Sequence, residues 1–252
     1  MEKISGVVIT LNEENNVEDC IKSLQNVCDE VLVIDSLSKD NTVEIAKQNG
    51  AIVIEQEYLG DGPQKAFGVP KAKNDWILCI DADERLDADS LKMIPTLDYT
   101  NPKKAYAFKR KNYVGNHWVK AAGFYPDYVT RLYNRNEAGY LEKKSHSKVM
   151  APKIVKTRCH LIHYTYKDFS HWMERLNWLS SRDAWAHYEK GTKPSKIRPV
   201  TSALAAFLRK FIFKGGFLQG IDGCTVTLTT IIRAYMKYMK LNEMYEKKKN
   251  DG

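Results

Sequence analysis

The sequence predicts an α/β fold, with a mostly parallel, twisted sheet followed by a C-terminal helical appendage. Short apolar runs rich in β-branched residues alternate with segments of helical spacing near the N-terminus. This alternation is typical of right-handed βαβ crossovers and a parallel sheet. Beyond residue 166, long segments of helical spacing replace it. We therefore expect two regions, residues 1–165 and residues 166–252.

Strands and helices alternate in the first region. Strands are expected at residues 4–10, 31–35, 51–54, 76–80 and 106–111, and helices at residues 17–24, 41–49 and 63–73. Asp40 or Asn41 is placed to cap the second of these helices, and Gly50 to end it. The stretch from 112 to about 167 lacks a clear pattern and is expected to be rich in loops.

The second region is expected to hold three helices. Asp168 is the expected N-cap of the first helix, and Gly191 is its expected C′ residue. Two more helices, residues 200–214 and 225–246, are expected on either side of a glycine cluster. Their apolar side chains are flanked by Lys and Arg. The two helices could pack their apolar faces on the rest of the chain, or they could form a surface that contacts anionic lipid.

Composition narrows the class of protein. The chain of 252 residues carries a net charge of +8, which predicts an anionic partner. It has no helix-turn-helix, zinc or RNA-binding signature, so nucleic acid is not the expected partner. Five cysteines without a C-x-x-C pair indicate reduced thiols in a cytosolic protein. We find neither a signal peptide nor a run of about 20 apolar residues, and we expect no passage across a membrane.

Three polar segments directly follow expected strands: Thr10–Glu14, Asp35–Asp40 and Asp81–Glu84. Ligands of open α/β sheets bind beyond the carboxyl ends of the strands. We therefore expect these segments to form one site.

Asp81 and Asp83 are two carboxylates at the point where a strand turns. Such oxygen ligands suit Mg²⁺ or Mn²⁺, which also bridges substrate phosphates. A second pair of the same spacing, Asp87 and Asp89, precedes a helical pattern. There we expect Asp89 or Ser90 to be a helix N-cap instead.

Four other residues are candidates for the site, and three of them have two interpretations. Asp35 fits an acceptor for a nucleotide base or ribose hydroxyl, or a turn residue that binds its own backbone. Lys65 is placed to reach a diphosphate from the start of a helix. Asp127 fits a general base and Arg131 a phosphate ligand, but the two also fit an ion pair at helical spacing. The histidines at 146, 160 and 163 are too scattered for a helical metal motif and are expected to be structural.

The three N-terminal segments together resemble glycosyltransferase family 2, the inverting enzymes with the GT-A fold. The resemblance is carried by residues 7–14 (Val-Val-Ile-Thr-Leu-Asn-Glu-Glu), residues 33–42 with the pattern D-x-x-S-x-D-x-T, and residues 79–84 (Cys-Ile-Asp-Ala-Asp-Glu). In the second half, residues 113–118, 123–134 and 216–223 are similar to the lipopolysaccharide inner-core glucosyltransferases. That resemblance covers nearly the whole chain.

The resemblance implies a role for each candidate residue. Thr10, Asn12, Glu13 and Asp35 would hold uridine, Asp81 would lie near the ribose, Asp83 would ligate Mn²⁺ or Mg²⁺ on the diphosphate, and Asp127 is the expected base. Lys65 and Arg131 complete the expected donor-binding set.

The same resemblance implies the partners. They are a UDP-sugar donor, glucose being the expected sugar, and a lipopolysaccharide-core or other lipid-linked acceptor. The protein would then lie in the cytoplasm, peripherally bound to the anionic inner face of the cytoplasmic membrane. The chain departs from the family at Ser147, where a Glu is usual, and nearby Glu142 is the candidate to replace it. The alternative is a non-catalytic or degenerate member that acts as a basic membrane-surface or nucleic-acid-binding protein.

Overall fold

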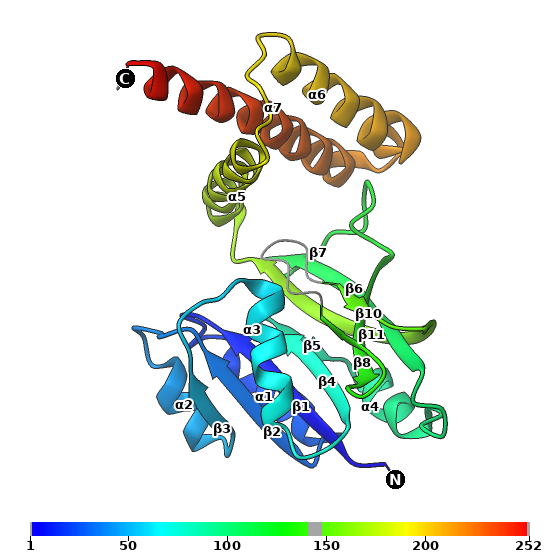
Figure 1. Cartoon of the computed structure of the whole chain (residues 1–252). Coiled ribbons are helices and arrows are strands. Elements are labelled where there is room, and N and C mark those ends of the chain that lie inside the picture. Colours follow the sequence, from blue (N-terminus) through cyan, green and yellow to red (C-terminus); the bar gives the residue numbers. More distant parts are fainter. Residues whose placement is uncertain (1, 141–147, 251–252) are drawn as a thin grey trace. The chain divides into compact units, whose positions relative to one another are not determined.

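The structure is a computed structural model of the chain, and it describes residues 2–140 and 148–250 (Figure 1). The chain divides into two compact units. Unit 1 comprises residues 1–111 and 126–164, and unit 2 comprises residues 112–125 and 165–252. The segment 112–125, which no feature of the sequence pattern set apart, therefore leaves the first unit and returns to it.

Four parallel strands form one half of the sheet of unit 1. They are β1 (Ile4–Thr10), β2 (Glu30–Asp35), β3 (Ile52–Glu55) and β4 (Trp76–Asp81), in the order β3-β2-β1-β4. The buried apolar runs of β1, β2 and β4 are typical of strands covered on both faces. The register pairs Thr10 with Asp35, and Ile9 with Asp81. The carboxyl ends of β1, β2 and β4 therefore meet at one edge, as predicted.

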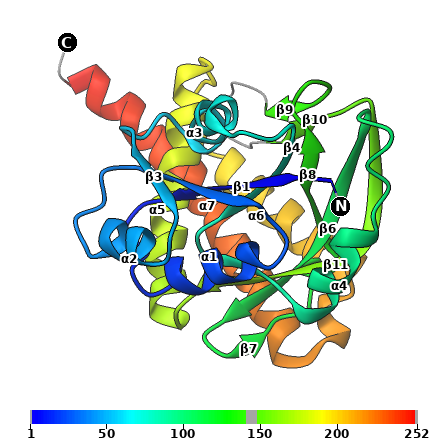
Figure 2. The same cartoon turned by 90° about the horizontal axis from the view of Figure 1, so that it is seen from below.

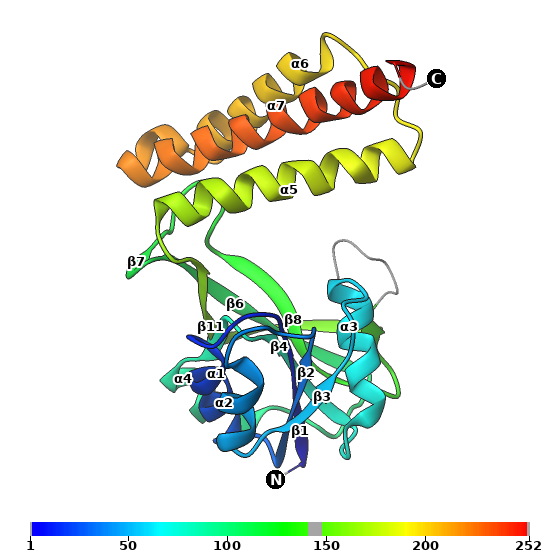
Figure 3. The same cartoon turned by 90° about the vertical axis from the view of Figure 1, so that its left-hand side faces the viewer.

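Helices cover both faces of these strands. α1 (Val17–Gln25) and α2 (Thr42–Gln48) lie on one face and α3 (Asp61–Gly68) on the other (Figures 2 and 3). α3 lies close to the sheet because Gly68 has no side chain: a Cβ there would come within 2.6 Å of Ile34 Cγ1. This close packing holds Lys65, one turn earlier in α3, at the edge where the strands end. A short 3₁₀-helix (Val69–Lys71) follows α3.

The other half of the sheet is antiparallel. It adds β8 (Asp127–Asn134), β6 (Lys104–Val114), β11 (Lys153–Tyr166) and β5 (Glu84–Leu86), in that order after β4. The expectation of a loop-rich stretch from 112 to 167 is therefore wrong. Thr157, Cys159 and Leu161 are buried at alternate positions of β11, but Thr157 is polar and the apolar Ile162 directly follows Leu161, which weakens the alternating pattern in the sequence. One-sided burial of this kind is common in antiparallel sheets.

The sheet curls because of where β5 pairs. β5 begins three residues after the end of β4, yet it pairs with β11 at the far end of the strand order. The two-residue link Ala82–Asp83 thus joins both ends of the sheet. α4 (Ala88–Met93) follows, and its N-cap is Asp87, whose side chain accepts from the Ser90 N–H. The expected cap at Asp89 or Ser90 is wrong, because α4 begins at Ala88, directly after Asp87, so that Asp89 and Ser90 lie in the first turn of the helix.

The remaining elements of unit 1 are short. A 3₁₀-helix (Ile94–Thr96) extends α4, and β9 (Gly139–Tyr140) and β10 (Val149–Met150) form a separate antiparallel pair. The α/β class with C-terminal helices is confirmed by this topology, with parallel pairing restricted to the first four strands.

Unit 2 consists mainly of helices. They are α5 (Phe169–Glu189), α6 (Arg198–Phe207), a π-helical turn (Leu208–Phe213), a 3₁₀-helix (Gly216–Leu218) and α7 (Gly220–Asn250). Asp168 caps α5 by accepting from the His171 N–H at 2.7 Å, and Gly191 follows α5 with φ 68°, so both expectations are confirmed. α7 packs against both α5 and α6 (Figure 3).

α7 begins earlier than expected, at Gly220 instead of residue 225. The reason is a close approach of two backbones: a Cβ on Gly223 would lie 1.9 Å from the Gly216 carbonyl oxygen. Gly223 therefore belongs to the helix and is not a helix breaker. A short strand, β7 (His117–Trp118), forms a hairpin with the end of β6. Within the described residues, no helix combines the length and apolar character that crossing a bilayer requires.

Candidate active site

The loops after β1 and β2 are tied together by their motif side chains. The Asn12 backbone N–H donates to Ser38 Oγ at 2.8 Å, and Asn12 Oδ1 accepts from the Lys39 N–H at 2.8 Å. The Glu13 N–H donates to Thr42 Oγ1 at 2.8 Å. Asn12 has a left-handed backbone (φ 55°), which Asn tolerates better than most residues. The Ser and Thr of the D-x-x-S-x-D-x-T pattern thus hold the β1 loop in place.

Asp35 is buried at the end of β2 and makes local hydrogen bonds. Its Oδ2 accepts from the Ser38 N–H at 2.8 Å, and its Oδ1 accepts from the Ser38 hydroxyl at 2.5 Å. Asp35 therefore acts as a turn residue that binds the nearby backbone, which is one of the two interpretations that the sequence allowed. Each carboxylate oxygen has two lone pairs, so these bonds leave acceptor capacity for a ligand. Thr10, paired with Asp35 in register, is buried with no hydrogen-bond partner for its Oγ1.

Asp81 ends β4 between two buried cations. Lys65 Nζ lies 2.6 Å from Asp81 Oδ1, and Arg131 Nη2 lies 2.7 Å from Asp81 Oδ2. Burial alone would raise the pKa of Asp81, but the charges of Lys65 and Arg131 outweigh it and hold that pKa well below its usual range. Asp81 is therefore ionised. The two cations expected to face a diphosphate are each paired with a protein carboxylate.

Glu84, the first residue of β5, completes this ion cluster. Its side chain is fully buried, and its Oε1 lies 2.5 Å from Arg131 Nη2 and 3.6 Å from Arg110 Nη1. Its Oε2 accepts from the Asp81 backbone N–H at 3.2 Å. Sequence reasoning assigned Glu84 no role, because the partners come from β8 and β6, far away in the chain. A buried carboxylate of this kind needs its cation to remain in the protein interior.

Asp83 lies in the link between β4 and β5, and within the described residues only one of its two carboxylate oxygens has a protein partner. The Tyr164 N–H donates to the Asp83 carbonyl at 3.0 Å, and His163 Nε2 lies 3.3 Å from Asp83 Oδ2. Burial alone would lower the pKa of His163, but the Asp83 carboxylate raises it above its ordinary value. Asp83 Oδ1 is buried and has no hydrogen-bond partner. Sequence spacing did not connect His163 with Asp83, because only the pairing of β11 with β5 brings them together.

An unpaired carboxylate oxygen fits a hard divalent cation. Among the described residues, no group of three or more His, Cys, Asp or Glu side chains could hold a metal ion by itself. Mg²⁺ and similar ions in nucleotide sites are commonly held by one or two carboxylates together with water and substrate phosphates. Asp83, with His163 beside it, fits a site of this open kind.

Asp127, the expected base, begins β8 and pairs across the sheet. Arg110 lies opposite it on β6, and Arg110 Nε and Nη2 lie 2.9 Å and 2.6 Å from Asp127 Oδ2. The alternative of an Asp127–Arg131 pair at helical spacing is wrong, because residues 127–134 form a strand. Both contacts with Arg110 use the same carboxylate oxygen.

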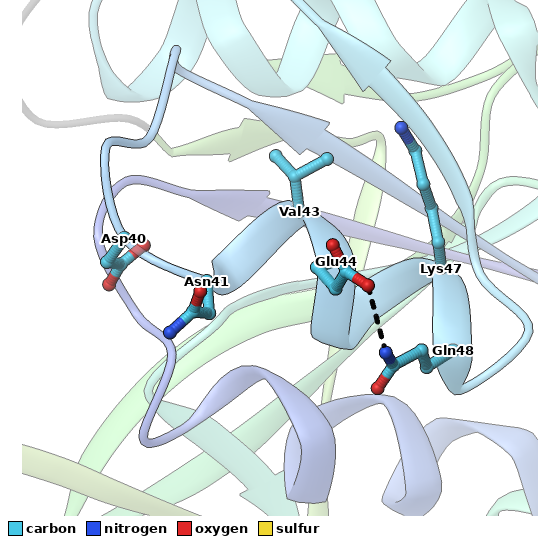
Figure 4. A pocket seen from close by; sticks show the side chains of 6 residues that line it. All are labelled: Asp40, Asn41, Val43, Glu44, Lys47 and Gln48. Atoms are coloured by element: carbon cyan, nitrogen blue, oxygen red, sulfur yellow. Dashed lines mark hydrogen bonds between the residues drawn. The ribbon is translucent and has the colours of Figure 1, made fainter.

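The remaining candidate residues lie outside the cluster formed by Asp81, Glu84 and Arg131 or outside the described residues. His160 Nδ1 lies 3.5 Å from Asp87 Oδ2, next to the cap of α4. Glu142, His146 and Ser147 lie outside the described residues. A hollow of about 360 Å³ along α2 is lined by Asp40, Asn41, Val43, Glu44, Lys47 and Gln48 (Figure 4). It contains none of the carboxylates at the ends of β2 and β4, so the candidate site is not this hollow.

Comparison with known proteins identifies the family of this chain. Residues 5–158 match the family model described as Glycosyl transferase family 2. An uncharacterized glycosyltransferase of Rickettsia felis is 32% identical over 99% of this chain and 93% of its own length. The lipopolysaccharide core biosynthesis glycosyltransferase LpsC of Rhizobium meliloti is 24% identical over 96% of this chain and 93% of its own length.

A solved structure is also similar in part. Glucosyl-3-phosphoglycerate synthase of Mycobacterium tuberculosis, in complex with Mn²⁺, UDP and glucosyl-3-phosphoglycerate, is 27% identical with a TM-score of 0.36, and the match covers 44% of each chain. The family match spans more than half of the present chain, and the Rickettsia relative spans nearly all of it. This chain therefore belongs to glycosyltransferase family 2.

Proposed function

We propose that this family 2 glycosyltransferase moves a sugar from a UDP-sugar to a membrane-linked glycan, with one Mn²⁺ or Mg²⁺ ion and with inversion at the anomeric carbon. Glucose is the first candidate for the sugar. The observation that carries the proposal is the buried, unpaired Oδ1 of Asp83 at the end of β4, beside the ion-paired Asp81. A buried polar atom without a partner at such an edge is a natural point for ligand binding.

The nucleoside would occupy the edge formed by β1 and β2. Asp35 has acceptor capacity for the N3–H of uracil, and the unpaired Thr10 hydroxyl lies on the neighbouring strand. Asn12 and Glu13 fix the loop that borders this edge through their bonds to the β2 loop. Because the frame is held by hydrogen bonds within the protein, little of it has to be ordered when the nucleotide binds.

The diphosphate would lie at the end of β4. Asp83 would hold the divalent cation, which when bound neutralises negative charge on the diphosphate leaving group. Asp81 stays ionised beside Lys65 and Arg131, so the three form a fixed arrangement of charge next to Asp83. Such preorganised charge stabilises the transition state because it needs no rearrangement during the reaction.

The transfer would be a single displacement. An acceptor hydroxyl oxygen forms a bond to the anomeric carbon, the bond from that carbon to the UDP oxygen breaks, and UDP leaves with the electron pair. The hydroxyl proton passes to Oδ1 of Asp127, because Arg110 engages Oδ2. Arg110 would also fix the orientation of the Asp127 carboxylate.

A membrane-linked acceptor is supported by the similarity to a lipopolysaccharide core biosynthesis glycosyltransferase over 96% of the chain. A phosphorylated core glycan is anionic, and the net charge of +8 complements it. Such an acceptor places the enzyme in the cytoplasm at the inner face of the cytoplasmic membrane.

Calorimetric titration of UDP with and without Mn²⁺ tests the proposal. Wild-type protein should bind UDP more tightly with Mn²⁺, and Asp83→Asn should lose most of that gain. Asp89→Asn is the matched control, because it changes an exposed Asp of the second Asp-Ala-Asp sequence. It should bind as wild type does. Absence of UDP binding under every metal condition would refute the proposal.

A further inference from the structure

The turn between α6 and α7 exposes a group of large apolar side chains. We call residues 209–221 the hairpin tip; it includes most of the π-helical turn, the 3₁₀-helix and the start of α7. Phe213, Leu218 and Ile221 are 80%, 76% and 80% exposed, and Ile212 and Phe217 are also exposed. Single exposed apolar residues are common on soluble proteins, but a continuous group on one turn indicates an interaction surface.

The backbone of the hairpin tip is held in a defined shape. Gly215 is left-handed (φ 63°) and ends the π-helical turn. A Cβ on Gly223 would lie 1.9 Å from the Gly216 carbonyl oxygen, and a Cβ on Gly216 would lie 2.8 Å from the Lys210 carbonyl oxygen and from Thr227 Oγ1. The rings of Phe211 and Phe217 lie 5.8 Å apart, which anchors one side of the turn. The exposed side chains are therefore presented by an ordered turn.

Basic residues dominate the charge around the hairpin tip, and Asp222, which directly follows the tip, lies 2.8 Å from His117. Residues 190–221 contain seven Lys and Arg and no Asp or Glu, against a net charge of +8 for the whole chain. Arg209 and Lys214 within the tip are exposed, while Lys210 Nζ donates to the Ala122 carbonyl at 2.7 Å. Apolar side chains that project between cations match a surface with anionic headgroups above an apolar layer.

We propose that the hairpin tip inserts into an anionic lipid bilayer. Phe213, Leu218 and Ile221 enter the boundary between headgroups and acyl chains, and Arg209 and Lys214 contact lipid phosphates. A second copy of the chain is a poorer occupant, because it would bring two strongly positive segments together. This inference rests on the proposed function in one respect: a membrane-linked acceptor requires the enzyme to reach a bilayer.

Co-sedimentation of the full chain with vesicles tests the proposal without any donor or metal. The vesicles contain phosphatidylethanolamine with about one third phosphatidylglycerol, and vesicles of phosphatidylcholine alone are the neutral control. Wild-type protein should bind the anionic vesicles and not the neutral ones. The triple variant Phe213→Ser, Leu218→Ser, Ile221→Ser should lower the partition coefficient by about tenfold or more. Arg209→Gln with Lys214→Gln should lower it by about tenfold at low salt, and less at high salt.

Ile154→Ser is the matched control, because Ile154 is 51% exposed but lies in β11 of unit 1. It should leave vesicle binding unchanged. Wild-type binding that survives the triple variant would overturn the proposal. Failure of the wild-type protein to bind anionic vesicles would also overturn it. This includes the case in which the wild type forms dimers instead and the triple variant dissociates them. UDP calorimetry on the same variants keeps this test separate, because loss of the membrane surface leaves UDP binding intact.

Discussion

Removing the cation at the centre of the ion cluster should destabilise unit 1. Arg131 is buried and bridges Asp81 and Glu84 at 2.7 Å and 2.5 Å. Arg131→Met removes the charge but keeps much of the side-chain volume. Asp81 retains Lys65, whereas Glu84, which is fully buried, retains only Arg110 Nη1 at 3.6 Å among the cations that pair with it in the described structure.

The expected loss follows from that uncompensated carboxylate. Breaking a buried ion pair by removing one partner typically costs about 3–5 kcal/mol. Because Arg110 still lies near Glu84, we expect the lower end, about 3 kcal/mol of unfolding free energy. The double variant Arg131→Met with Glu84→Gln should recover about 1 kcal/mol or more, because the amide carries no charge.

Urea denaturation followed by circular dichroism measures these differences. Lys22→Met is the matched control: Lys22 lies in α1 and pairs with Glu18 across one helical turn, with both side chains exposed. Surface pairs of this kind contribute about 1 kcal/mol or less. If Arg131→Met falls within about 1 kcal/mol of wild type, the cluster does not depend on Arg131 as we infer.

Three further expectations concern other parts of the chain. Gly223→Ala should destabilise unit 2, because the new methyl group would overlap the Gly216 carbonyl. Gly139→Ala is the control and should be tolerated, because no atom of the described residues beyond its two chain neighbours lies within 4 Å of a Cβ at Gly139. Thermal denaturation of both variants checks this. Of the five cysteines only Cys224 is exposed, so Ellman's reagent should titrate one thiol in native protein and all five in denaturant. Burial would raise the pKa of Asp87, but Lys111 and the helix-capping bonds from Ser90 lower it, so the ionised carboxylate stabilises the fold. This stabilisation should be present above about pH 4 and should be lost as the pH falls through the lowered pKa. It should be missing in Asp87→Asn. A stability difference between wild type and Asp87→Asn that does not shrink in acid would contradict this.

The first 81 residues could be predicted well because each signal there is local. Apolar runs such as Ile4–Thr10 are buried on both faces, and the helices between them keep their apolar spacing. Parallel strands end at one edge, so the placement of Asp35 and Asp81 at the same edge followed from the parallel pairing alone. The N-cap of α5 at Asp168 could also be predicted, since N-capping depends on neighbouring residues in the sequence.

The antiparallel half could not be predicted in the same way. Its strands β8 and β11 are only partly buried, and polar residues such as Arg131 and Thr157 occupy buried positions, so the hydrophobicity does not alternate in the sequence. The ion-pair partners of Glu84, Asp83 and Asp127 all come from this half. Glu84 meets Arg131, and His163 meets Asp83, only because strands distant in the chain pair together. Asp127 was identified from the motif, but its partner Arg110 follows from strand register.

Release of UDP from UDP-glucose is the most direct test of the central claim. Wild-type protein with Mn²⁺ should release UDP, slowly with water and faster with a lipid-linked core glycan as acceptor. A chelator should stop the release, and added Mn²⁺ should restore it. Asp83→Asn should show little release, while Asp89→Asn should match wild type. Release that is unaffected by the chelator and by Asp83→Asn would contradict the account, as would the absence of release from every UDP-sugar supplied.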